Sequence, residues 1–212
     1  MNSVPPRATG QLSIWTDVDP AHELDFNRWY DREHMQERIA IAGFRRARRF
    51  RCLVSCPRPY LALYDTQSVQ TFHSAAYQQA FATQTEWSRR NFGRMRDTQR
   101  RVGELIVDVG AAEGGALALF VVNVDALDGI AARCQALVAR DHVLRASLLR
   151  TDVALSVPLS ATAPPTQADA VAMVEANDAD TAFDAANALA AQVQTRQNGG
   201  VFVFALMSRF GA

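Results

Sequence analysis

A glutamate and a histidine stand side by side at Glu33 and His34, in a segment rich in aromatic rings and charges. The segment, residues 25–38, reads DFNRWYDREHMQER. Aromatic neighbours raise the pKa of a carboxylate, and an imidazole exchanges protons near neutral pH, so both residue types can act as an acid or base on a small molecule. Glu33 and His34 are therefore the candidate catalytic residues.

The spacing of this segment is that of an amphipathic helix. At 100° per residue, Phe26, Trp29 and Tyr30 share one face, which we expect to be buried and to line an apolar pocket. Glu33 falls in the middle of this face, Glu37 also falls within it, and His34 lies at its edge. The other positions are interpreted as a solvated face: Arg28, Asp31, Arg32, Met35 and Arg38.

Two interpretations of the acid and the histidine stay open. A buried carboxylate must be paired, protonated or in a wet pocket, so Glu33 either pairs with an arginine of the following strand or serves as a pocket acid or base. His34 is either a half-exposed, hydrogen-bonded side chain or a pocket residue that exchanges a proton with a ligand.

Arginines alternate along the predicted strand 44–53, FRRARRFRCL. A period of two places Arg46 and Arg48 on one face, but both faces carry charge, so the sequence does not tell which face meets the helix. We expect Arg46 and Arg48 to bind an acidic group or oxyanion of the ligand, and Tyr64 on the next strand to line the same pocket.

The elements that would position these residues occur twice in the order β-α-β-β-α-β. The first set comprises strand 11–18, helix 19–41, strands 44–53 and 60–66, helical segments 69–82 and 86–98, and strand 102–109. The second comprises strand 116–124, helix 126–140, strands 142–155 and 169–177, helix 178–194 and strand 201–208. This order predicts an α+β chain of two tandem ferredoxin-like βαββαβ units whose apolar sheet faces pack together.

The predicted organisation is a flexible N-terminus (1–10), a first repeat with the site (11–110), a linker (111–115) and a second, structural repeat (116–212). The formal net charge of zero argues against nucleic acid and anionic membranes as partners. All 22 basic residues are arginines, which excludes lysine chemistry. Three cysteines give neither a disulfide framework nor a metal site. With no signal peptide and no apolar run long enough for a membrane span, we expect a cytoplasmic protein.

The tandem pattern resembles the dimeric α/β-barrel superfamily, in which paired ferredoxin-like units close a barrel. Residues 25–105 are similar to its EthD-like branch through NRWYDREHMQER, GFRRARRF, YLALYD, AAY and TEW, and they depart from it at Gln36, where proline is common. The resemblance implies an intramolecular barrel and a ligand site between the helices and the sheet of one unit. It also implies cofactor-free oxidation, isomerisation or dehalogenation, with haem chemistry in some branches.

The expected function is that of a cofactor-independent oxidoreductase or isomerase acting on a small apolar or aromatic compound. One alternative is a non-catalytic, stress-related module that carries such a ligand or haem, with His34, His73 or His142 as the iron ligand. Another is a purely structural domain. A further homodimer of the two-repeat chain is considered as an assembly.

Overall fold

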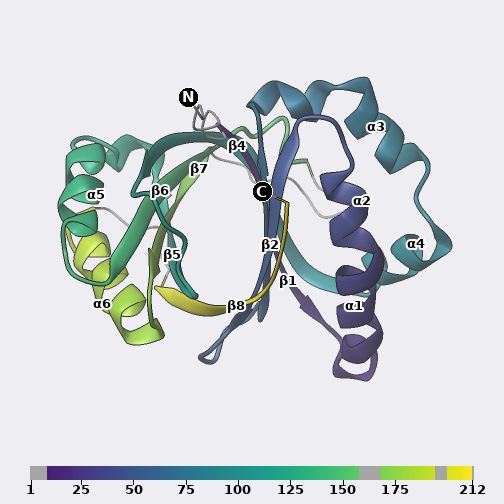
Figure 1. Cartoon of the computed structure of the whole chain (residues 1–212), viewed down its shortest axis with the longest axis horizontal. Coiled ribbons are helices and arrows are strands. Elements are labelled where there is room, and N and C mark those ends of the chain that lie inside the picture. The colour runs from purple at the N-terminus through teal and green to yellow at the C-terminus, as the bar shows by residue number, and fades with distance from the viewer. Residues whose placement is uncertain (1–8, 158–167, 194–199, 212) are drawn as a thin grey trace, which may run out of the picture.

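Eight antiparallel strands close into a barrel, and helices cover its outer surface on two opposite sides (Figure 1). The computed structural model describes residues 9–157, 168–193 and 200–211. The strands are β1 (Gly10–Val18), β2 (Phe44–Cys52), β3 (Tyr60–Thr66), β4 (Met95–Val109), β5 (Ala116–Asn123), β6 (Val143–Thr151), β7 (Asp169–Ala176) and β8 (Phe202–Gly211). Their order around the barrel is β1-β3-β2-β8-β5-β7-β6-β4.

One long, interrupted helical stretch follows β1. It comprises η1 (Pro20–His22), α1 (Glu23–Trp29), a π turn η2 (Tyr30–His34) and α2 (Met35–Ile39). The other helical elements are η3 (Val69–His73), α3 (Ala75–Ala82), α4 (Glu86–Phe92), η4 (Val124–Ala126), α5 (Ile130–Val138) and α6 (Ala179–Ala190). Side-chain caps start several of them: Asp19 accepts from Ala21 N, Thr85 from Ser88 N and Asp178 from Thr181 N.

The predicted α+β barrel is confirmed, and its closure is by strand pairing. The edge strands of the two halves form antiparallel ladders, β2 with β8 and β4 with β6, so the sheets join edge to edge. The apolar inner faces then meet in the lumen, where the buried cluster contains Trp15, Phe50, Leu61, Leu63, Leu105, Leu117, Leu119, Leu149, Val171, Met173 and Phe204.

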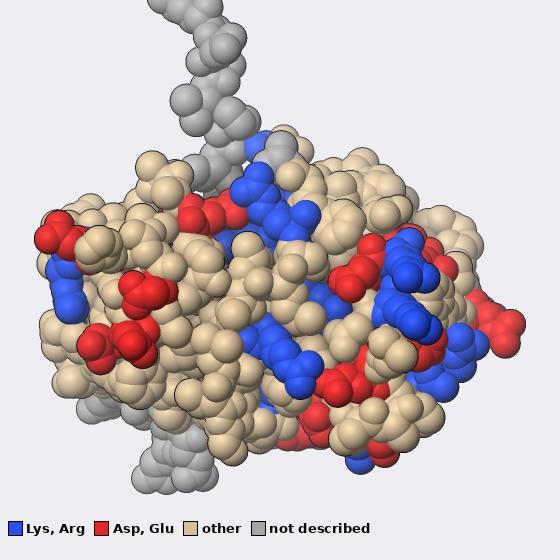
Figure 2. Space-filling view, turned by 60° about the horizontal axis from the view of Figure 1, so that its bottom comes forward, with Lys and Arg blue, Asp and Glu red and all other residues tan. Residues whose placement is uncertain are grey.

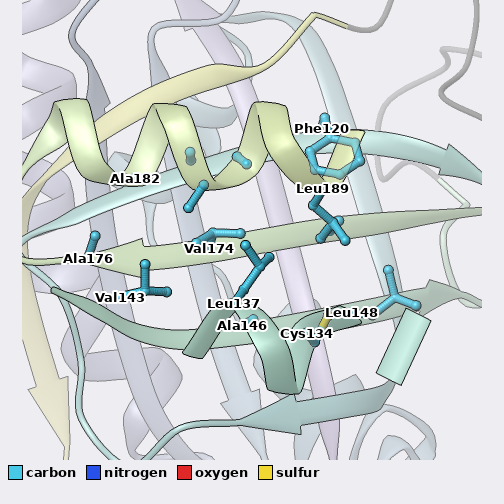
Figure 3. Packing of buried hydrophobic residues seen from close by; sticks show 14 of the residues in the cluster. Phe120, Cys134, Leu137, Val143, Ala146, Leu148, Val174, Ala176, Ala182 and Leu189 are labelled. Carbon is cyan, nitrogen blue, oxygen red and sulfur yellow. The ribbon is translucent and has the colours of Figure 1, made fainter. Parts of the chain in front are cut away.

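The outer faces of the strands pack against the helices. In β3, period-two alternation sends Leu61 and Leu63 into the lumen and Tyr60, Ala62 and Tyr64 toward the helices. The second half repeats this arrangement with smaller side chains. Figure 3 shows them close together between α5, α6 and the strands, among them Phe120, Cys134, Leu137, Ala182 and Leu189.

Several predicted helices are shorter in the structure, and two of them show why. The predicted helix 86–98 ends at Phe92, and Met95–Val109 is one 15-residue strand, because its first part pairs with β1 at Val18 and Asp17. The predicted helix 126–140 becomes regular only at Ile130, since Gly129 takes a left-handed conformation with φ of 70°. Most of the predicted flexible N-terminus lies outside the described residues, as do residues 158–167 between the predicted strands 142–155 and 169–177.

In the described part of the chain, every helix is too short or too polar to cross a lipid bilayer. Acidic and basic side chains are interspersed on the face drawn in Figure 2.

Candidate active site beside His34

A cavity of about 410 Å³ lies on the helix-covered side of the first half of the barrel. Its lining comes from β1, the π turn, the ends of α3 and α4 and the start of β4: Ile14, Tyr30, His34, Phe81, Gln84, Phe92, Gly93, Met95, Thr98 and Arg100. Apolar walls with a few polar groups, at this size, are typical of small-molecule sites.

The π turn brings the histidine into this cavity. The backbone N–H of Met35 donates to the carbonyl of Tyr30, five residues back, which inserts one extra residue into the helical turn. The His34 ring consequently stacks on the Trp29 ring, with their centroids 4.3 Å apart, and the side chain is only 4% exposed. π turns inside α-helices are frequent at functional sites.

His34 is a buried, neutral imidazole. Its Nδ1 is buried and has no hydrogen-bond partner among the described residues, and the side chain lines the cavity. Burial, and then the positive charges of Arg38 and Arg49, hold the pKa of His34 well below its ordinary value. The ring is therefore uncharged at neutral pH and can accept a proton.

Arginines surround this histidine on the helix side. Arg49 is 1% exposed, lies 4.2 Å from the centre of the Tyr30 ring and donates to Asn27 Oδ1 at 2.6 Å. Arg38 is 4% exposed and lies over the Phe81 ring at 5.3 Å. These guanidinium groups create a positive field that favours an anion in their neighbourhood.

Two buried tyrosines complete the surroundings. Burial raises the pKa of Tyr30, and it raises the pKa of Tyr64 well above its ordinary value. Both phenols therefore stay protonated. Tyr30 lines the cavity, whereas Tyr64 lies behind His34, with ring centroids 6.1 Å apart.

Glu33 lies outside the cavity lining and positions α4. Its Oε1 accepts hydrogen bonds from Thr85 Oγ1 at 2.6 Å and Ser88 Oγ at 3.2 Å. Trp29 Nε1 donates to the same Ser88 hydroxyl at 3.0 Å. The described hydrogen-bond partners of Glu33 are thus hydroxyls of α4 and its cap. Of the two interpretations left open for Glu33, the pairing with an arginine of β2 is wrong.

Glu37, also predicted on the aromatic face, is partly exposed, and burial followed by the nearby charge of Glu33 raises its pKa. Met35 and Arg38, predicted as solvated, are buried. Phe26 and Trp29 are fully buried beside Tyr30 and form the wall behind the π turn.

Arg46 and Arg48 lie on the other side of the sheet, inside the barrel. Arg46 pairs with Asp65 and Glu113, and Arg48 Nη1 lies 2.7 Å from Glu175 Oε2. Asp65 shares the lumen face of β3 with Leu61 and Leu63. The arginine pair expected to meet a ligand beside His34 is thus separated from it by the sheet.

Arg38, Arg49 and Arg100 take the place of the expected arginines near the cavity. Alternation along β2 places Arg49 on the face opposite to that of Arg48. Nothing in the sequence shows which of these two faces meets the helix. Arg100 lies opposite Ile14 of β1 in the strand ladder, in a stretch whose start was predicted as helix.

We expect His34 to make the folded state less stable in acid. The unfolded chain protonates His34 near pH 6.5 and the folded chain does not, so the unfolded state binds more protons below that pH. The free energy of unfolding should therefore fall as pH drops from about 6.5 to 5, by up to about 1.4 kcal/mol per pH unit. Urea titrations at several pH values measure this slope.

His34→Phe should flatten the slope in this pH range, because phenylalanine fills the aromatic site without titrating. His73→Phe, at an exposed position of η3, is the matched control and should keep it. An unchanged slope in His34→Phe would mean that the imidazole is hydrated and protonated in the folded state.

The sequence matches no protein-family model and no curated protein. Solved structures share the fold over nearly the whole chain. An anthrone oxidase-like protein superposes with a TM-score of 0.64 at 10% identity, covering 97% of this chain and 94% of that one. A chlorite dismutase variant from Candidatus Nitrospira defluvii gives 0.53 at 9% identity, with coverages of 95% and 92%. A haem-binding protein from Thermus thermophilus gives 0.50 at 9% identity, with coverages of 96% and 92%. At these identities, the likeness identifies an α/β-barrel fold.

Proposed function

We propose that the protein is an enzyme that oxidises a small aromatic or otherwise apolar compound in the cavity beside His34, using dioxygen and no bound cofactor. The observation that carries this proposal is a neutral imidazole, buried without a described partner for Nδ1, at an apolar cavity in the field of buried arginines. An anthrone oxidase-like protein shares the fold, which agrees with chemistry of this kind.

The chemistry begins with a proton transfer. A substrate with an acidic C–H next to an aromatic ring gives its proton to Nε2 of His34, and the electron pair stays on the carbon. The positive charges of Arg38 and Arg49 destabilise a protonated His34. The same charges stabilise the negative charge of the substrate anion that forms in the same step.

The electron-rich carbanion then reacts with dioxygen. For a methylene group, one oxygen atom becomes a ketone oxygen, and the other leaves as water with the two former methylene hydrogens. Substrate carbon is oxidised and dioxygen is reduced, so atoms and electrons balance without a further reductant. The apolar walls formed by Phe81, Phe92 and Met95 would keep bulk water from the anion.

We further propose that the barrel consists of two tandem ferredoxin-like units of the EthD-like kind, residues 11–110 and 116–212, joined by 111–115. The strand orders β4-β1-β3-β2 and β8-β5-β7-β6 support this division. The catalytic site belongs to the first unit, and the second unit completes the barrel.

A haem-binding module is the other candidate, because a haem-binding protein shares the fold. The three histidines considered as iron ligands do not fit that role. A histidine that ligates a metal almost always donates its other ring N–H to an acceptor, and Nδ1 of His34 has none among the described residues. His73 and His142 are exposed and do not line the cavity. Hemin added to the purified protein should give no imidazole-ligated Soret band.

The pH dependence of turnover tests the proposal. Oxygen uptake is followed with anthrone and a panel of aromatic compounds that carry an acidic methylene. Because the lowered pKa keeps His34 neutral, kcat should stay level from about pH 8 down through pH 6.5, where an ordinary histidine would be half protonated. A half-maximal rate near pH 6.5, or no uptake above the spontaneous rate across the panel, would contradict it.

A further inference from the structure

Arg100 brings a buried positive charge to the cavity wall. It stands on the outer face of β4 opposite Ile14, lines the cavity and is 9% exposed. Its Nη1 donates to the backbone carbonyl of Leu155, and its Nη2 donates to the hydroxyl of Tyr77 at 3.0 Å. Its Nε is buried and has no hydrogen-bond partner in the described part of the chain.

The other buried arginines on the barrel strands have carboxylate partners, whereas Arg38 on α2 resembles Arg100 in having none among the described residues. Arg48 pairs with Glu175 at 2.7 Å, Arg101 with Asp169 at 2.9 Å, and Arg145 with Asp108 at 2.7 Å. For Arg100, the described residues supply backbone carbonyl groups and a phenol, all of them uncharged. A buried guanidinium that lacks a counter-charge is costly, and this cost is relieved when an anion binds.

We infer that the compound bound in this cavity is an aromatic carboxylate, with its acid group on Arg100 and its ring between Ile14, Phe81, Phe92 and Met95. The guanidinium has five N–H donors, so Nε–H and a remaining Nη–H stay available for two carboxylate oxygens. This inference rests on the proposed function and names the substrate class of the same site: an aromatic acid whose acidic carbon faces His34.

The acid group also explains why the cavity lies in a positive field. A carboxylate held by Arg100 anchors the substrate before any proton moves. Arg38 and Arg49 then remain to stabilise the second negative charge, which develops only when His34 takes the proton. Arg100 therefore acts in substrate binding, and Arg38 and Arg49 act in the reaction. Substitution of one arginine at a time can separate the effect on binding from the effect on the reaction.

Binding of two probes with the same ring system tests the inference. 2-Naphthoate carries the acid group, and 2-naphthamide is its neutral counterpart of nearly equal size. Titrations are followed by calorimetry and by quenching of tryptophan fluorescence, since Trp29 stacks on His34 at the cavity. We expect wild type to bind 2-naphthoate about tenfold or more tightly than 2-naphthamide, which is the scale of one charge-assisted contact.

Arg100→Gln should remove this preference, and Arg100→Lys should keep most of it. Arg96→Gln is the matched control, because Arg96 lies on the same strand but is half exposed and pairs with Asp17 and Asp19. If Arg100→Gln does not fold, the comparison of the two probes in wild type and Arg100→Lys still decides.

Equal or tighter binding of 2-naphthamide to wild type overturns the inference and leaves the proposed oxidase intact. A preference for 2-naphthoate that persists in Arg100→Gln overturns the role of Arg100. If neither probe binds, the aromatic-carboxylate site is contradicted, and oxygen uptake with anthrone and the methylene panel decides the proposed function separately.

Discussion

Replacing Glu175 with glutamine should lower the free energy of unfolding by roughly 3–5 kcal/mol, the cost of leaving buried charges without their partner. Glu175 is 1% exposed inside the barrel. It accepts hydrogen bonds from Arg48 Nη1 at 2.7 Å, from Arg145 Nη1 at 3.3 Å and from the backbone N–H of Gly114 at 3.2 Å. A glutamine amide in this position has one oxygen that can accept and carries no negative charge. One of the two guanidinium groups is therefore left without an adequate partner.

The effect is large because Glu175 links the two halves of the barrel. Arg48 belongs to β2 and Glu175 to β7, so their pair crosses the lumen, and Arg145 extends the network to Asp108 on β4. Chemical denaturation followed by circular dichroism measures the change. Glu104→Gln is the matched control, since Glu104 pairs with Arg150 where both side chains are about half exposed, and it should cost at most about 1 kcal/mol. A similar small loss in Glu175→Gln would show that water screens the lumen network.

The strands could be predicted well because alternation is a local signal. β3 has the predicted bounds, Tyr60–Thr66, and β1 differs from its prediction by one residue. The orientation of β2 could not be predicted, because the partners of its arginines come from distant strands: Asp65 from β3 and Glu175 from β7. A register shift after Phe44 also puts that ring on the helix side, away from the lumen face of Arg48.

The helix at the site was predicted at the correct residues, but the predicted orientation of its side chains about the helix axis was wrong. A wheel at 100° per residue assumes an α-helix throughout, whereas the π turn at Tyr30–His34 adds a residue to one turn. The residues of this turn and those that follow are rotated: Met35 and Arg38 are buried, and Glu33 reaches the hydroxyls of α4. Trp29, which stacks on His34 at this turn, also donates a hydrogen bond to Ser88 of α4, and composition and spacing show neither of these tertiary contacts.

This rotation separates two neighbours that the sequence presented as equal candidates for proton transfer. His34 lines the cavity, and Glu33 holds Thr85 and Ser88. We therefore expect His34→Phe to lower kcat/KM for dioxygen-dependent oxidation by about 10²–10⁴-fold, the usual contribution of a positioned general base. The phenyl ring fits the stack on Trp29, so binding of 2-naphthoate should change much less than turnover. Oxygen uptake gives the rate, and calorimetry gives the affinity.

Glu33→Gln is the variant that decides between the two neighbours. Its amide oxygen can still accept from Thr85 and Ser88, so we expect a modest loss of stability and a kcat within a few-fold of wild type, with the same pH profile. Because the carboxylate lies outside the cavity lining, its charge has no direct route to the reacting carbon. If Glu33→Gln instead lost activity as severely as His34→Phe while binding 2-naphthoate normally, the proton would pass to the carboxylate. Substrate binding would then have to rotate the π turn and bring Glu33 to the cavity.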